Sequence, residues 1–193
     1  TKSARLYIAG QELTDIRSQD IKNRLADGMK CLVEQVYTNL KMLTIDYDDS
    51  MLRSILTSTT SGTLFGSLEA DVCSTEIFNE ISKQKRMAVR TKVKDLVDVF
   101  RGGTYGWYET AILCIIAKLY KMDKISFRSN GNIVAERDIY TALTNLTQQQ
   151  NTIVDIEETI TVSQITKLKN LYREFFNDET CVASSAKDVH SAF

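Results

Sequence analysis

The chain has 193 residues, of which 43% are hydrophobic and 25% charged, and its 24 basic and 25 acidic side chains nearly cancel. This composition is typical of a globular protein of one or two domains. There is no proline and only one histidine, His190. Proline-rich linkers, His-rich metal sites, HExxH helices and Ser-His-Asp catalysis within the chain are therefore excluded.

The cysteines indicate a reduced protein. Cys31, Cys73, Cys114 and Cys181 lie 42, 41 and 67 positions apart, so no CxxC motif exists, and we expect small buried or half-buried thiols. No apolar run could span a bilayer and no signal peptide is recognisable, which favours a cytoplasmic location and no membrane partner. The first residue is Thr1, which indicates either a segment of a longer chain or removal of an initiator Met.

The chain opens with a predicted short strand over residues 5–9, ended by Gly10. A long amphipathic helix is predicted over residues 18–43, capped by Ser18 or Asp20. Its apolar side chains recur at intervals of three and four and form one stripe. The stripe comprises Ile21, Leu25, Met29, Leu32, Val36, Leu40 and Leu43.

A second helix is predicted over residues 49–56, and the Ser/Thr/Gly-rich residues 57–66 form the best candidate domain boundary. We therefore predict a helical segment over residues 1–68, whose 8 basic and 8 acidic residues cancel.

Residues 69–135 follow the order of a winged helix-turn-helix domain. Asn130 and Gly131 lie between alternating apolar residues and predict a β-hairpin over residues 124–134. This segment carries a charge of +3, from 11 basic and 8 acidic residues. Three helices are predicted before the hairpin, over residues 69–85, 91–100 (capped by Thr91) and 107–122.

Residues 136–193 are predicted to form an acidic α/β segment with a charge of −4, from 5 basic and 9 acidic residues. It contains a helix over residues 136–146, a strand over residues 152–156 and a helix over residues 162–176. The whole chain is thus predicted to be mainly α (α+β), and only its middle segment has a charge that favours anion binding.

The densest basic cluster lies in residues 83–94, which contain no acid. The default interpretation is a solvated loop and helix start; the alternative is contact with nucleic-acid phosphates, assisted by Arg128 in the hairpin. The third helix is almost wholly apolar and offers few groups to base edges, so any DNA contact would be to the backbone. The six basic residues are Lys83, Lys85, Arg86, Arg90, Lys92 and Lys94.

Tyr105, Trp107 and Tyr108 cluster before the third helix. They could receive a partner or stack on a base, but packing of the turn onto the core is the favoured interpretation. None of the eight glycines is followed by Lys, which excludes the P-loop GxxxxGK[ST]. Asp155 and the acids after it are interpreted as solvated groups of an edge strand. We predict no catalytic, cofactor-binding or metal-binding residue in this chain.

Residues 105–108 (YGWY) and 110–119 (TAILCIIAKL) resemble a stretch of the large P-loop ATPase family of bacteriophage-exclusion (BREX) systems, the BrxC/PglY family. Thr104 stands where that family commonly has proline. Weaker similarity follows in order along most of the chain. It covers residues 5–10 (RLYIAG), 32–37 (LVEQVY), 93–97 (VKDLV) and 163–176 (SQITKLKNLYREFF).

The resemblance implies a fragment of a phage-defence ATPase whose ATP and Mg²⁺ site lies elsewhere; no catalytic residue carries over. The implied partners are the rest of that ATPase and other phage-defence proteins. We expect a non-catalytic interaction or regulatory module that mediates assembly or relays nucleotide state. The alternative is a DNA-binding winged-helix module that contacts the phosphate backbone through residues 83–94.

Overall fold

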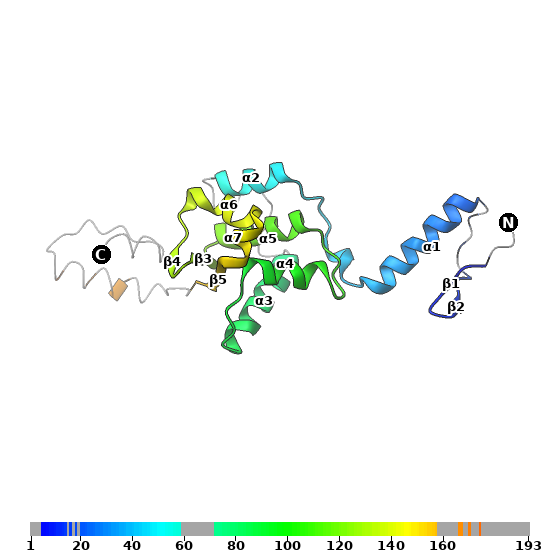
Figure 1. The fold of residues 1–193 in the computed structure, drawn as a ribbon, viewed down its shortest axis with the longest axis horizontal. Helices are drawn as coiled ribbons and strands as arrows, with labels where there is room; N and C mark the ends of the chain where they lie inside the picture. Colours follow the sequence, from blue (N-terminus) through cyan, green and yellow to red (C-terminus); the bar gives the residue numbers. More distant parts are fainter. Residues whose placement is uncertain are drawn as a thin grey trace.

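The structure is a computed structural model that describes residues 5–58 except 15, 17 and 19, residues 72–157, and the single positions 166, 167, 170 and 174 (Figure 1). Most of the predicted boundary loop, most of the predicted helix over 162–176, Cys181 and His190 lie outside the described residues; the four single positions are helical. The elements are β1 (Tyr7–Ile8), β2 (Gln11–Glu12), α1 (Ile21–Val36), η1 (Leu40–Met42), α2 (Asp49–Thr57), α3 (Val72–Arg86), α4 (Val93–Arg101), α5 (Glu109–Lys121), β3 (Ile125–Ser129), β4 (Asn132–Ile133), η3 (Glu136–Asp138), α6 (Ile139–Thr144), α7 (Leu146–Asn151) and β5 (Thr152–Ile156).

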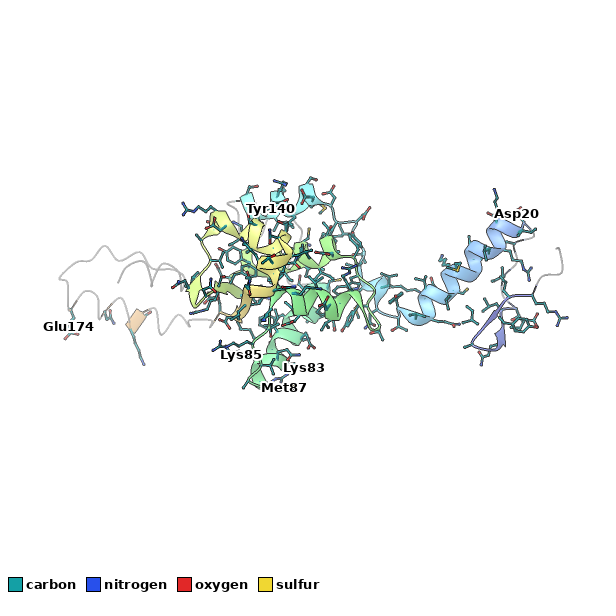
Figure 2. All side chains as sticks on the ribbon, in the orientation of Figure 1. Asp20, Lys83, Lys85, Met87, Tyr140 and Glu174 are labelled. Atoms are coloured by element: carbon teal, nitrogen blue, oxygen red, sulfur yellow. The ribbon has the colours of Figure 1, made fainter. Side chains whose placement is uncertain are left out.

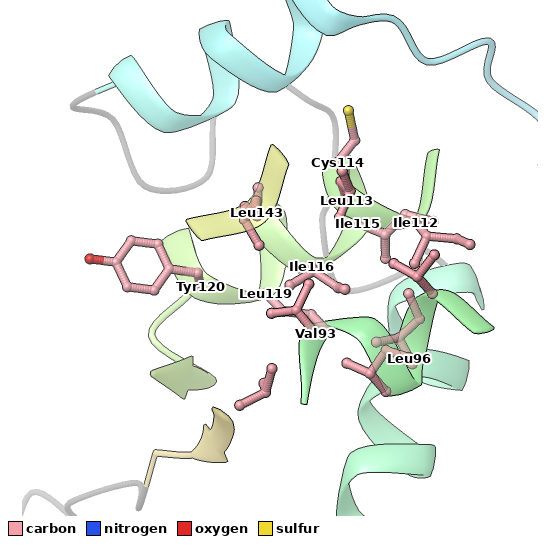
Figure 3. Packing of buried hydrophobic residues seen from close by; sticks show 14 of the residues in the cluster. Val93, Leu96, Ile112, Leu113, Cys114, Ile115, Ile116, Leu119, Tyr120 and Leu143 are labelled. Atoms are coloured by element: carbon pink, nitrogen blue, oxygen red, sulfur yellow. The ribbon is translucent and has the colours of Figure 1, made fainter. Parts of the chain in front are cut away.

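Helix α5 forms the centre of the core. Residues 111–120 are all buried, because the apolar residues of this helix run around its whole circumference. Figure 3 shows Ile116 and Leu119 of α5 beside Val93 of α4; the same buried cluster includes Leu96 of α4 and Leu143 of α6. The predicted mainly α (α+β) class with a winged-helix centre is confirmed. The described part of the chain contains no helix that is long and apolar enough to cross a membrane.

The wing is a short antiparallel sheet in the order β4-β3-β5. The predicted hairpin is confirmed: Asn130 (φ 52°) and Gly131 (φ 84°) both take positive φ, as a two-residue turn between twisted strands requires. Strand β5 pairs with β3 in the register Phe127 to Val154. The three-part division of the chain remains a prediction, and this pairing crosses its boundary after residue 135.

Helix α2 covers the opposite side of α5. Leu52 and Ile55 of α2 are each 1% exposed, as their apolar spacing predicts. Polar contacts fasten α2 to α6: the Tyr140 hydroxyl donates to Asp49 Oδ1 (2.9 Å), and the Arg53 guanidinium lies 4.1 Å from the centre of the Tyr140 ring. Helix α5 is thus enclosed between α2 on one side and α3, α4 and the sheet on the other.

Helix α1 lies apart from this body, beside the β1–β2 hairpin (Figure 1). Asp20 caps it as predicted, with its carboxylate accepting from the Asn23 N–H at 3.1 Å. The predicted end at residue 43 is wrong, because α1 ends at Val36. The Asn39 N–H instead donates to the Thr104 carbonyl at 2.9 Å, which diverts the backbone onto the turn before α5.

Two other boundaries differ from the prediction. The N-cap of α4 is Lys92, whose N–H donates to Asp95 at 3.0 Å, and not Thr91. The Thr91 carbonyl accepts from the Val154 N–H at 2.8 Å, so its backbone serves the sheet. The helix predicted over 136–146 is η3 and α6, and α7 starts afresh because the Asn145 side chain accepts from two N–H groups at 3.0 and 3.1 Å.

Candidate interaction surfaces

The third helix of the winged-helix core, α5, has no exposed residue. Even Lys118 is only 4% exposed, and its ammonium donates to the Tyr47 hydroxyl at 2.9 Å while lying 4.8 Å from the centre of the Tyr47 ring. Glu109, at the first turn, pairs with Arg101 at 3.3 Å and accepts from Gln149 at 3.2 Å. In DNA-reading winged helices this helix enters the major groove, so its burial removes direct base readout.

The segment before α2 is bound to the start of α5. Tyr108 donates its hydroxyl proton to Asp46 Oδ1 at 3.0 Å and accepts from the Tyr47 N–H at 2.5 Å. Further along α5, burial raises the pKa of the Cys114 thiol to about 12, so this thiol stays protonated and unreactive at neutral pH. The two Tyr108 hydrogen bonds hold residues 46 and 47, just before α2, against the start of α5.

The aromatic residues 105–108 pack the turn onto the core. Trp107 is 1% exposed, stacks on Phe100 with ring centres 5.1 Å apart, and donates its indole N–H to the Asn39 carbonyl at 3.2 Å. Tyr105 is half-buried and donates its hydroxyl proton to Glu76 at 2.8 Å. Of the three residues proposed as a partner surface, Tyr108 alone is substantially exposed, at 41%. Trp107 is enclosed and is not available to a partner.

We define the basic loop as residues 83–94, which run from the last turn of α3 into the first turn of α4. Figure 2 shows Lys83, Lys85 and Met87 at the end of α3, projecting from the body. Two of its six cations are paired, Lys83 with Glu80 at 3.1 Å and Lys94 with Asp98. Within the described residues the other four make no ion pair and are exposed: Lys85, Arg86, Arg90 and Lys92.

Arg128 does not join the four unpaired cations. Its guanidinium pairs with Asp155 across β3 and β5 at 3.1 Å. Strand β5 also separates it from the basic loop, because Lys92 bridges to Ile153 on the far edge of β5. Asp155, which the sequence analysis interpreted as a solvated group of an edge strand, therefore neutralises Arg128 in the wing.

The basic loop is not purely cationic. Met87 and Val89 are 63% and 50% exposed. Two pockets of about 150 Å³ each flank residues 89–91, one toward α4 and one toward the end of β5. In the described part of the chain, no three His, Cys, Asp or Glu side chains come together in a way that could hold a metal ion.

Within the described residues, helix α1 carries a row of exposed apolar side chains. The sequence predicted the amphipathic pattern but not that its apolar side would face solvent. The adjacent side is the covered one: Gly28, about 60° around the helix from the middle of the apolar side, is buried against Leu6 and Ile16 of the N-terminal segment. We define the α1 stripe as Ile21, Leu25, Met29, Leu32 and Val36, which are 56%, 56%, 54%, 37% and 48% exposed.

The order of three helices and a hairpin, with β5 added to the sheet, defines a winged helix-turn-helix domain whose third helix belongs to the core. The sequence model of the BREX ATP-binding protein BrxC winged helix-turn-helix domain matches residues 39–158, and the chain belongs to this family. It is thus a winged-helix domain of a bacterial phage-defence system, as the resemblance implied. No solved structure matches the chain. Helix α1 precedes the matched region.

Proposed function

We propose that the chain is a non-catalytic interaction module of a BREX ATP-binding protein, which mediates assembly or relays nucleotide state to its partners. The family is that of an ATP-binding protein, yet the sequence contains no GxxxxGK[ST] motif, so the nucleotide and Mg²⁺ would be held by other residues of the system.

The observation that carries this proposal is the burial of α5. A recognition helix needs polar side chains free to reach base edges, whereas ten consecutive residues of α5 are enclosed. Because α5 is buried in the core of this winged helix, its DNA-reading face is not available. Other surfaces of the domain remain open to protein partners. The exposed apolar residues of α1 and of the basic loop supply such surfaces.

The proposal is tested by immobilising the 193-residue chain and adding, one at a time, the ATP-binding region and each other protein of the same BREX system, with ATP or ADP present. We expect saturable binding to at least one of them that persists when competitor DNA is added. Absence of binding to all of them, together with binding of duplex DNA, would contradict the interaction role.

A second candidate, contact with the DNA backbone, rests on the four unpaired cations of the basic loop. If each contacts one phosphate, the affinity for duplex DNA should fall roughly 150-fold between 50 and 200 mM salt, at a slope of about 0.9 per contact. A mobility shift at the two salt concentrations measures this, and failure to bind at 50 mM salt excludes the candidate.

The paired cations provide a matched control for that assay. Reversing Lys85, Arg86, Arg90 and Lys92 to Glu should abolish the shift if the basic loop binds phosphates. Neutralising Lys83 and Lys94, whose charges Glu80 and Asp98 already compensate, should change the affinity less than about threefold. Equal losses in both sets would indicate a nonspecific effect of net charge.

A further inference from the structure

The basic loop has a backbone that is already hydrogen-bonded on both sides of its apolar residues. Ala88 takes positive φ (56°), as residues at the end of a helix often do, and the Val89 N–H donates to the Gln84 carbonyl at 3.0 Å. On the other side, the Thr91 carbonyl accepts from the Val154 N–H at 2.8 Å. A partner that binds this loop therefore does not have to order it first, which lowers the entropic cost of binding.

One of the two pockets beside the loop is lined by apolar side chains. It lies between the end of α3 and β5, and its lining includes Ile81, Val154 and Ile156. Ile81 and Val154 are 1% and 2% exposed, so they belong to the core. The volume of about 150 Å³ is comparable to that of a cavity that binds benzene. The pocket therefore has room for one aliphatic or aromatic side chain.

Two cations also line this pocket. Lys85 and Arg90 are exposed and make no ion pair within the described residues. The carboxylate of the lining, Asp155, is already paired with Arg128 at 3.1 Å. Lys and Arg form their strongest hydrogen bonds with carboxylates and phosphates. A matching occupant would therefore offer an apolar group together with negative charge.

The exposed apolar side chains of the loop favour a protein over a nucleic acid. Met87 and Val89 are 63% and 50% exposed, and Figure 2 shows Met87 near Lys83 and Lys85. A phosphate backbone gains nothing from covering such side chains, whereas a protein segment can bury its own apolar side chains against them. Met and Arg are both enriched in interfaces between proteins. The four unpaired cations favour an acidic segment.

The chain's own acidic residues are a weaker match. Asp71 and Glu69 stand one and three positions before Val72, where α3 begins. The basic loop is at the other end of this helix of 15 residues, about 22 Å away, whereas three residues of chain span about 10 Å. Residues 158–193 hold 5 acidic and 4 basic residues, so their charges nearly cancel. A separate acidic segment matches the four cations better.

We propose that the basic loop binds an acidic segment of a partner protein, which places one apolar side chain in the pocket beside β5 and carboxylates on Lys85 and Arg90. This inference rests on the proposed function, and it names the site and the chemistry through which the module holds its partner. The cations attract acidic segments in general, and the pocket selects among them those that carry an apolar anchor.

Two fluorescent peptides, one of repeated Glu-Glu-Leu units and one of repeated Glu-Glu-Ser units, test the site by anisotropy with the 193-residue chain. We expect the Leu peptide to bind at least about tenfold more tightly, because only its side chains fill the apolar pocket. Equal affinities of the two peptides, or no binding of the Leu peptide, would overturn the proposal. Displacement of both peptides by an equimolar amount of duplex DNA would also overturn it, since the loop would then be a nucleic-acid site.

Variants of the loop locate the binding. Val89→Ser should weaken binding of the Leu peptide at least about fivefold and leave that of the Ser peptide unchanged. Lys85→Glu combined with Arg90→Glu should weaken both peptides at least about tenfold. Neutralising the paired Lys83 and Lys94 should change either affinity less than about threefold. Equal losses in the two sets of cations would mean that net charge, and not the pocket, attracts the peptides.

A photoreactive amino acid at Val89 tests whether the chain itself covers the site. Val72, a 55% exposed valine at the other end of α3, is the matched control. In the chain without peptide, we expect position 89 to form no more cross-links to residues 158–193 than position 72 does. A preferred cross-link from position 89 to those residues would overturn the separate partner.

The two proposals fail separately. If the Leu peptide binds but the immobilised chain binds no protein of the BREX system, the site stands and the interaction role within that system is wrong. If the chain binds a component, and the variant with Lys85→Glu and Arg90→Glu binds it equally well, the interaction role stands and the basic loop is not its surface.

Discussion

At Gly106 the structure leaves no room for a side chain. Its φ is +62°, a left-handed conformation that costs other residues energy, and an added Cβ would lie 2.5 Å from the Tyr37 ring. Gly103 in the same turn also has positive φ (+58°), but a Cβ there would meet nothing within 4 Å. Substitution of Gly103 therefore tests backbone strain alone, whereas substitution of Gly106 tests strain together with a steric clash with Tyr37.

We predict that Gly103→Ala lowers the free energy of unfolding by about 1 kcal/mol, from strain alone. Gly106→Ala should cost about 1–3 kcal/mol more, because Tyr37 must move off the turn. Urea denaturation followed by the fluorescence of Trp107, which is buried beside the turn, measures both variants. Equal effects of the two substitutions would show that Tyr37 does not pack on Gly106.

Tyr105 couples stability to alkaline pH. Burial, together with the bond to Glu76, raises the pKa of its hydroxyl from 10.0 to about 12. A group whose pKa is raised by folding adds stability below its unfolded pKa, and this addition is lost as the pH rises toward the folded pKa. Folding should therefore lose the contribution of Tyr105 between pH 10 and about 12.

Tyr105→Phe tests this linkage. It should lower the free energy of unfolding by about 1 kcal/mol at pH 8, the typical value of one hydrogen bond. The difference between the two proteins should shrink when the same urea titration is run at pH 11. A difference that is equal at both pH values would contradict the raised pKa.

At the scale of elements, the apolar faces of α2 and α1 differ in solvent exposure: the face of α2 is buried and that of α1 is exposed. Leu52 of α2 is 1% exposed and Leu25 of α1 is 56% exposed. Leu52→Ala should destabilise the chain by about 2–5 kcal/mol through the cavity it leaves under α2. Leu25→Ala should cost less than about 0.5 kcal/mol in the isolated chain. Thermal and urea unfolding of both variants provide the measurement, and a large loss for Leu25→Ala would mean that its face is covered in solution.

Several elements could be predicted from local pattern alone. Apolar periodicity predicts α2, α4 and α5 close to their observed positions. The turn residues Asn130 and Gly131 likewise predict the β3–β4 hairpin. The end of α1 could not be predicted, because contacts with Thr104, distant in sequence, decide it. Strand β2 was missed because two polar residues, Gln11 and Glu12, make no alternating pattern.

The candidate surfaces were only partly visible in the sequence. The basic residues of the loop could be listed, but which of them are paired depends on acids one turn away or on another strand, as for Arg128 and Asp155. The amphipathic pattern of α1 predicts one packed face; only the structure reveals that the packed side is around Gly28 and that the stripe is open. Periodicity identifies a face but not what covers it.

At the scale of the whole molecule, the positive charge of the middle segment is not gathered on a recognition helix. Within the described residues, much of it lies in ion pairs, and the rest includes the four cations of the basic loop that make none and Lys124. The sheet joins the middle segment to residues 152–156, and α2 closes the core from the N-terminal side. The body matched by the family is thus a closed unit, and α1 extends from it with its stripe exposed.

The central claim is that α5 is a core helix and does not read DNA. Hydrogen exchange of the 193-residue chain, with and without duplex DNA at 50 mM salt, tests it most directly. We predict that the amides of residues 111–120 exchange slowest in both samples and that DNA leaves them and the β3–β4 wing unchanged. Fast exchange in α5 of the free chain, or new protection of α5 and the wing when DNA is added, would contradict the claim.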